Sequence, residues 1–116
     1  MATLEKRRSP RVDVNNFVSY YLLDENDKIF HGGFGKSKNI SDVGILIETS
    51  ELIKTDFVIV AIIDEGNNFI EMKGKVRHSR KDKNNVIYTG IELIGDSEKK
   101  SAFAMLFKSA YRSNQD

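Results

Sequence analysis

Three arginines near the N-terminus and a short polar turn later in the chain carry the side chains best suited to bind an anion or a base. The arginines are Arg7, Arg8 and Arg11, and they precede the first apolar segment. A guanidinium is a planar fork that matches phosphate oxygens and the O6/N7 edge of guanine, and it can also stack on a base. The turn, residues 39–44, contributes amide and hydroxyl groups that can bond another edge of a base. The two groups together predict a nucleotide-binding surface.

Each group alone has an ordinary structural explanation. Basic N-terminal tails often only keep a protein soluble, and Asn, Ser and Gly are typical of hairpin turns. The prediction therefore depends on the pair. An arm ahead of the first strand and a corner between the second and third strands can lie side by side on a small barrel.

The composition indicates one soluble globular domain. The length of 116 residues is usual for a single domain, and a hydrophobic fraction of 40% with 30% charged residues argues against disorder across the body. A formal charge of +1 gives no overall field that would attract nucleic acid, although Lys6 adds to the positive charge at the N-terminal end. The chain has no cysteine, which excludes disulfides and cysteine-ligated metals.

No segment of the sequence predicts export or insertion into a membrane. Charged residues follow Met1 closely, unlike the apolar run of a signal peptide. The longest apolar run, residues 57–63, is far shorter than the roughly twenty residues that a spanning helix needs. We expect a cytoplasmic protein without a membrane span.

Turn-forming residues divide most of the chain into six predicted strands. Hairpin-length polar clusters at residues 24–28, 39–44, 64–68 and 81–85 separate them. In the clearest strand every second residue belongs to a predicted core face, which comprises Ile70, Met72, Gly74, Val76 and His78. The predicted strands span residues 12–23, 29–40, 44–48, 57–63, 70–78 and 87–93. The sequence therefore predicts an all-β fold, a six-stranded antiparallel β-barrel.

Helical spacing replaces this alternation near the C-terminus. Asp96 or Ser97 can cap a helix, and apolar residues recur on one helical face from Phe103 onward. We expect a flexible arginine-rich arm over residues 1–11, a barrel over residues 12–95, and a helix over residues 96–112 that packs on the barrel.

The motifs Arg7-Arg8-x-x-Arg11 and Asn39-x-Ser41-x-x-Gly44 resemble the two signatures of the PilZ-domain family. This is a family of bacterial receptors for cyclic di-GMP. The resemblance covers nearly the whole chain, because the family also has a six-stranded split barrel and a C-terminal helix. Its late-strand patterns are similar to residues 74–76 and 88–93.

The resemblance implies a non-catalytic cyclic di-GMP receptor that needs no cofactor and no metal. The arginine motif of the family holds phosphate and guanine, which assigns that role to Arg7, Arg8 and Arg11. The second motif assigns the guanine edge to Asn39 and Ser41 and a close backbone turn to Gly44. Lys6 can add charge, and family members differ in whether they hold one ligand or a stacked pair.

The resemblance also implies an output. The ligand would order the arm against the barrel, and the changed surface would signal by contact with a partner protein. In this family such a partner can belong to motility, pilus or exopolysaccharide machinery.

Two other functions remain open at this point. A small barrel with a basic arm and exposed aromatic residues can bind single-stranded nucleic acid, and a PilZ-like barrel can be a ligand-free adaptor for protein contacts. An enzyme is not expected, because His31 and His78 lie in separate strands without a nearby acidic cluster and Ser41 has no histidine placed as its base.

Overall fold

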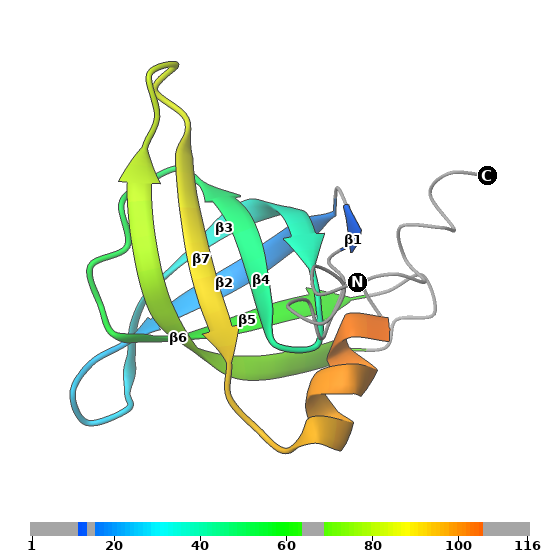
Figure 1. The fold of residues 1–116 in the computed structure, drawn as a ribbon. Coiled ribbons are helices and arrows are strands. Elements are labelled where there is room, and N and C mark those ends of the chain that lie inside the picture. Colours follow the sequence, from blue (N-terminus) through cyan, green and yellow to red (C-terminus); the bar gives the residue numbers. More distant parts are fainter. Residues whose placement is uncertain (1–11, 14–15, 64–68, 106–116) are drawn as a thin grey trace.

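Turn-forming and β-branched segments alternate along the chain and give seven strands in the computed structural model, which describes residues 12–13, 16–63 and 69–105. All paired strands are antiparallel, in the order β1-β3-β2-β5-β6-β7-β4, and an additional β3–β4 pairing closes six of them into a barrel (Figure 1). The predicted six-stranded antiparallel β-barrel is confirmed. The strands are β1 (Val12–Asp13), β2 (Phe17–Leu23), β3 (Ile29–Ile40), β4 (Gly44–Thr49), β5 (Phe57–Ile63), β6 (Phe69–Lys81) and β7 (Ile87–Leu93).

The single strand predicted over residues 12–23 is wrong, because the chain forms β1 and β2 there instead. Both strands pair with β3, but their registers differ by one residue. Asp13 pairs with Asn39 and Phe17 pairs with Lys36, so the chain between β1 and β2 contains one residue more than the facing part of β3. Asn16 lies at this irregularity. Its backbone N–H donates to the Ser37 hydroxyl at 3.0 Å, and its carbonyl accepts from the Ser37 backbone N–H at 2.7 Å. The Ser37 hydroxyl therefore replaces a backbone acceptor at this irregularity and keeps the chain between β1 and β2 bonded to β3.

Two hairpin turns use the same side-chain chemistry. Oδ1 of Asp24 accepts from the backbone N–H groups two and four residues later, and Asp82 repeats this pattern in the β6–β7 hairpin. The fourth residue of each turn, Asp27 or Asn85, has a positive φ, near 62° or 65°. Asn and Asp tolerate this conformation better than most residues. The predicted turns at 24–28 and 81–85 are thus explained by their sequence.

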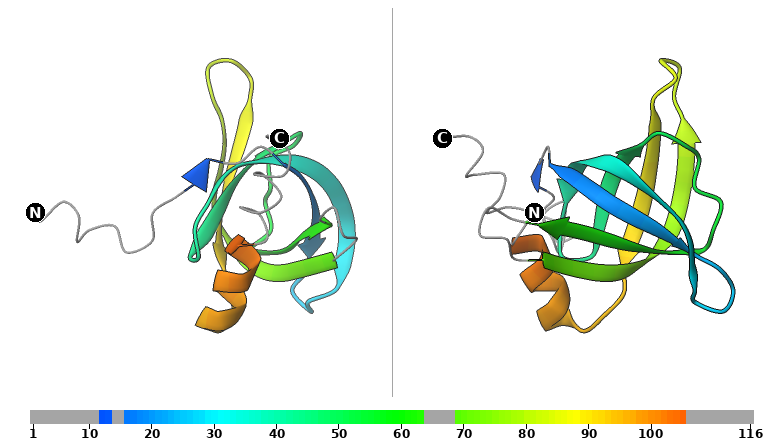
Figure 2. Two further views of the ribbon diagram at one scale, coloured as in Figure 1. Left: turned by 90° about the vertical axis from the view of Figure 1, so that its right-hand side faces the viewer. Right: turned by 180° about the vertical axis from the view of Figure 1, so that it is seen from behind.

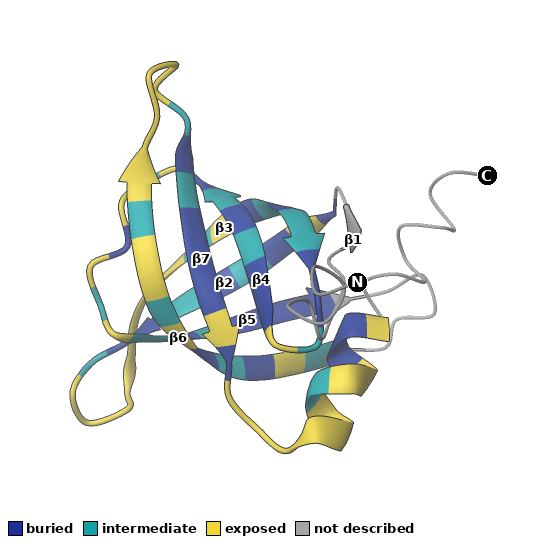
Figure 3. Cartoon of the chain, viewed as in Figure 1, coloured by how far each residue is buried: buried dark blue, intermediate teal, exposed yellow. Residues whose placement is uncertain are grey.

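The barrel interior is filled by the inward-facing residues of alternate positions (Figure 3). A helix covers the end of the barrel where β4 begins, and residues 97–105 are its described part (Figure 1). Oδ1 of Asp96 accepts from the backbone N–H of Lys99 at 2.8 Å, as expected for a helix cap. Phe103 and Ala104 are buried in the core cluster, so the helix packs on the barrel. None of the described helical residues forms a segment long and apolar enough to cross a membrane.

The predicted core face of β6 is wrong at its last member, His78. The register between β6 and β7 shifts between Val76 and His78, so Arg77 is an extra residue there. Beyond the shift, the inward-facing and outward-facing positions of β6 are exchanged. His78 is exposed, and the next residue, Ser79, turns inward and bonds the buried Thr89 hydroxyl at 2.8 Å.

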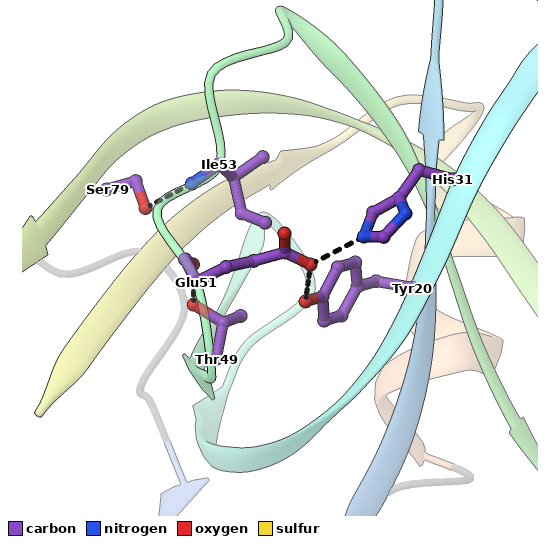
Figure 4. A network of polar contacts seen from close by, with 6 residues as sticks. All are labelled: Tyr20, His31, Thr49, Glu51, Ile53 and Ser79. Carbon is purple, nitrogen blue, oxygen red and sulfur yellow. Dashed lines mark hydrogen bonds and ion pairs between the residues drawn. The ribbon is translucent and has the colours of Figure 1, made fainter.

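A polar network fixes the loop of residues 50–56 across the other end of the barrel (Figure 4). Oε2 of Glu51 accepts from the Tyr20 hydroxyl at 2.6 Å and also lies 2.9 Å from Nε2 of His31. The Tyr20 ring can lie across β3 only because its neighbour there is Gly33, where an added Cβ would stand 2.5 Å from the ring. Ile53, from the same loop, is buried and its N–H donates to Ser79.

The network perturbs the ionisation of both partners. Burial, and then the hydrogen bond to Glu51, raise the pKa of Tyr20 to about 12. The hydrogen bonds from Tyr20 and His31 hold the pKa of Glu51 below its usual value. The folded state therefore favours a neutral phenol beside an ionised carboxylate.

Replacing Tyr20 with Phe should lower the free energy of unfolding by about 1–2 kcal/mol, because a partly buried charge-assisted hydrogen bond is lost while the ring is kept. Urea denaturation at neutral pH measures this. Tyr21→Phe is the matched control, since Tyr21 lies on the outer surface of the same strand, and it should change the stability by less than about 0.5 kcal/mol. Equal effects of the two substitutions would contradict the role of the network.

The raised pKa of Tyr20 also predicts an alkaline transition. A folded-state pKa above the ordinary value of 10.0 contributes stability that is complete below about pH 10 and is lost as the pH rises toward about 12. In a spectrophotometric titration, the wild type should show a tyrosine ionisation near pH 12. The Tyr20→Phe variant should lack this late step and should lose less stability between pH 10 and pH 12.

Candidate functional site

A cavity of about 600 Å³ lies on the outer face of the barrel beside the turn between β3 and β4. This volume suits a small-molecule ligand. The strands β4, β7 and β6 form its floor, and they face the viewer in Figure 1. Its lining is Asn39, Val43, Gly44, Ile45, Leu46, Arg77, His78, Gly90, Ile91 and Glu92. Two residues of the second predicted motif, Asn39 and Gly44, are therefore part of one cavity wall.

Ser41, the remaining residue of that motif, is buried beneath the turn and fixes its backbone through hydrogen bonds. Its hydroxyl oxygen accepts from the backbone N–H groups of Val43 at 3.2 Å and Gly44 at 3.3 Å, and its own N–H donates to the Gly44 carbonyl at 2.9 Å. The residue is only 1% exposed. The Val43 carbonyl accepts from Leu93 of β7, which ties the turn to the cavity floor. Ser41 thus holds the backbone that presents Asn39 and Gly44.

The segment that follows the arginine motif runs along the same turn. Val12 pairs with Ile40, and Asp13 pairs with Asn39. Lys6, Arg7, Arg8 and Arg11 themselves lie outside the described residues. The structure therefore brings the residues directly after the motif, and not the motif itself, next to Asn39.

A glycine at the centre of β7 makes room for a side chain of the neighbouring strand on the cavity floor. Gly90 pairs with Leu46 on one side and with His78 on the other. An added Cβ at Gly90 would stand 2.4 Å from Cε1 of His78, so only glycine lets the imidazole ring lie over β7. The imidazole ring, packed against the Gly90 backbone, is part of the cavity lining.

The charged groups of the cavity are accessible. Nη1 of Arg77 lies 3.2 Å from Oε1 of Glu92, and both side chains are more than half exposed. Such a surface pair contributes little stability, so Arg77 can exchange its partner for an anionic ligand at small cost. In the adjacent turn, Oδ1 of Asp42 is buried and has no hydrogen-bond partner in the part of the chain that the structure describes. A buried acceptor of this kind requires a donor.

Sequence reasoning missed three of these residues: Arg77, His78 and Gly90. A glycine inside a strand pattern indicates close approach of another group, so Gly90 had a detectable signal. Arg77 and His78 had none, because their direction depends on the register shift in β6. Among the described residues, no group of three His, Asp or Glu side chains could hold a metal ion.

Comparison with known proteins links this arrangement to one family. The sequence matches the PilZ domain over residues 5–107. No curated protein matches the chain at a significant level.

Three similar solved structures have the same fold, and all are bacterial proteins. The inhibitor of motility MotI/DgrA of Bacillus subtilis has a TM-score of 0.63 at 19% identity and covers 94% of this chain and 51% of its own. The PilZ domain of YcgR from Escherichia coli, solved with cyclic di-GMP, has a TM-score of 0.62 at 7% identity and covers 95% of both chains. The MrkH–cyclic di-GMP complex of K. pneumonia has a TM-score of 0.58 at 15% identity and covers 95% of this chain and 55% of its own.

The chain thus spans about half the length of MotI and MrkH and nearly all of the YcgR domain. The match over residues 5–107 includes the arginine motif, the barrel and the described part of the helix. On this match the chain belongs to the PilZ-domain family.

Proposed function

We propose that this protein is a non-catalytic receptor for cyclic di-GMP that acts in the cytoplasm and signals by contact with a partner protein. The observation that carries the proposal is the pairing of Val12 and Asp13 with Ile40 and Asn39 at the edge of the cavity. It anchors the residues after the arginine motif beside the second motif. The arginines would complete the site by lying over the cavity.

The chemistry of the two parts matches the ligand. Cyclic di-GMP has two phosphates and two guanines, and the Watson–Crick edge of guanine presents N1 and N2 donors. Asn39 can accept from that edge through its side-chain oxygen, and the His78 ring is an aromatic group of the cavity lining on which the base can stack. Guanidinium forks suit both the phosphates and the O6/N7 edge of guanine, which gives Arg7, Arg8 and Arg11 their role. Lys6 adds positive charge to the same arm.

The turn also offers a docking point for the arm. Oδ1 of Asp42 is a buried acceptor without a partner among the described residues, and a guanidinium of the arm could supply the donor. Ser41 would act by holding the turn in shape, because its hydroxyl already accepts two backbone bonds. The ligand would then be enclosed between the arm and the cavity floor.

A receptor of this kind needs no chemical step. A ligand shifts an equilibrium only by its different affinity for two states, and here the two states differ in the position of the arm. Ordering the arm costs conformational entropy, which reduces the affinity but creates a new surface for a partner.

Replacing Arg7 or Arg11 with Ala should weaken cyclic di-GMP binding by more than about tenfold, which corresponds to about 1.4 kcal/mol. Isothermal titration calorimetry measures the affinity. Lys83→Ala is the control, because Lys83 is an exposed cation at the tip of the β6–β7 hairpin, and it should bind like the wild type. Unchanged affinity in both arginine variants would refute the proposed site.

Replacing Gly90 with Val should also weaken cyclic di-GMP binding by at least about tenfold, because the new side chain fills the cavity floor and displaces the His78 ring. The matched control is Ser19→Val, which adds a similar side chain to the outer face of β2, away from the cavity. Both variants should keep the circular dichroism spectrum of the wild type. Normal binding by a folded Gly90→Val protein would place the ligand elsewhere.

A further inference from the structure

Two phenylalanines on the outer face of the β2–β3 hairpin are almost fully exposed. Phe17 is 78% exposed and Phe34 is 77% exposed. Phe17 lies opposite Lys36, and Phe34 lies opposite Ser19 in the next outward-facing row. The Tyr21 ring continues this surface one row further along β2. We call Phe17, Tyr21, Phe34 and Lys36 the aromatic face.

The aromatic face lies on β2 and β3, whereas the floor of the cavity lies on β4, β7 and β6. In the closed strand order, β2 and β7 are three strands apart in either direction. The strands β4, β7 and β6 face the viewer in Figure 1, whereas β2 and β5 face the viewer in the right panel of Figure 2. None of the residues of the aromatic face lines the cavity.

The exposed rings do not contribute to the core, which is formed by the inward-facing residues of the same strands. Two exposed phenylalanines present on the order of 300 Å² of apolar surface, which is close to the largest patch of a typical monomer. Such a patch is most often an interaction site. A stable dimer buries roughly 800 Å² on each partner, so the aromatic face alone is too small for one and suits a short protein segment.

Lys36 defines the chemistry of that segment. Its Nζ lies 5.6 Å from the centre of the Phe17 ring. Lys36 has no ion pair within the described ranges, whereas Lys38 pairs with Glu48 and Lys73 pairs with Asp27. One available cation can bind one carboxylate next to an apolar contact. A single-stranded nucleic acid would need several phosphate contacts, which this face does not supply.

We infer that the aromatic face is the docking surface for a partner protein, and that it binds a segment presenting apolar side chains beside carboxylates. This inference gives the proposed receptor its output and in that sense rests on the proposed function. The contact itself does not require cyclic di-GMP.

A direct connection leads from the cavity to the aromatic face. The paired residues of β1 end at Asp13, and Asn16 then holds Ser37 through two backbone-donated hydrogen bonds. Phe17 follows Asn16 in the chain, and Lys36 precedes Ser37. A ligand that orders the arm would therefore restrain the segment that carries Phe17. Cyclic di-GMP should change the affinity of the aromatic face for its partner.

The test uses a short acetylated and amidated peptide that alternates Leu and Glu, titrated into the full isotope-labelled chain and followed by NMR. We expect the amide signals of Phe17, Phe34 and Lys36 to shift. The double variant Phe17→Ser/Phe34→Ser and the variant Lys36→Glu should each weaken binding by at least about tenfold. The control is Leu52→Ser/Met105→Ser, which removes two exposed apolar side chains outside the aromatic face and should bind the peptide normally.

Three results would overturn the inference. They are equal binding of a peptide that alternates Leu and Lys, preferential binding of oligothymidine at the same face, and self-association of the wild type that the Phe variants abolish. The first would remove the role of Lys36, and the others would assign the face to nucleic acid or to a second copy of the chain.

A second set of measurements separates this inference from the proposed function. Peptide binding without cyclic di-GMP tests the aromatic face alone, and calorimetry with cyclic di-GMP alone tests the receptor. Cyclic di-GMP should change the peptide affinity of the wild type by at least about threefold and should have no effect in Asn39→Ala. An unchanged wild-type affinity would refute the connection through Asn16.

Discussion

The pairing of β3 along both of its edges is the interaction on which the barrel and its candidate site depend. The first part of β3 pairs with β2, and its last residues pair with β4 on one edge and with β1 on the other. The β3–β4 pairing closes the sheet, so no long strand edge is left open. The same pairing creates the turn at 39–44, and the β1 pairing brings the N-terminal segment to that turn. The end of β3 therefore both closes the barrel and holds β1 next to the candidate site.

A closed barrel of this size has no room for a ligand inside. Tyr20, Phe103 and the aliphatic residues of all six strands fill the interior. Any binding site must therefore be built on the outer surface, from residues whose neighbours leave space. Gly90 makes room for the His78 ring on the cavity floor, and the outward-facing phenylalanines of β2 and β3 provide a separate apolar surface. In the two proposals made above, the ligand and the partner are assigned to different faces of the barrel.

Register shifts decide which side chains reach these surfaces. One extra residue at Arg77 turns His78 from the predicted core face to the cavity, and another near Asn16 separates β1 from β2. A bulge exchanges the two faces of a strand and disrupts the hydrogen-bond ladder only locally. It can therefore place one polar side chain on the outside without breaking the strand. Both shifts lie next to residues of the candidate site.

The sequence by itself determined the barrel, because strict alternation, β-branched residues and Asp- and Asn-rich turns are local signals with a period of two. It also identified the turn at 39–44 and the family, since those depend on residue types at fixed spacing. The tertiary structure decided that Asn39 and Gly44 share a cavity with Arg77, His78 and Gly90, and that Ser41 lies beneath the turn. The reason is physical: which strands are neighbours and where a ladder shifts by one residue depend on pairing between distant segments, and a single extra residue reverses the direction of every side chain after it.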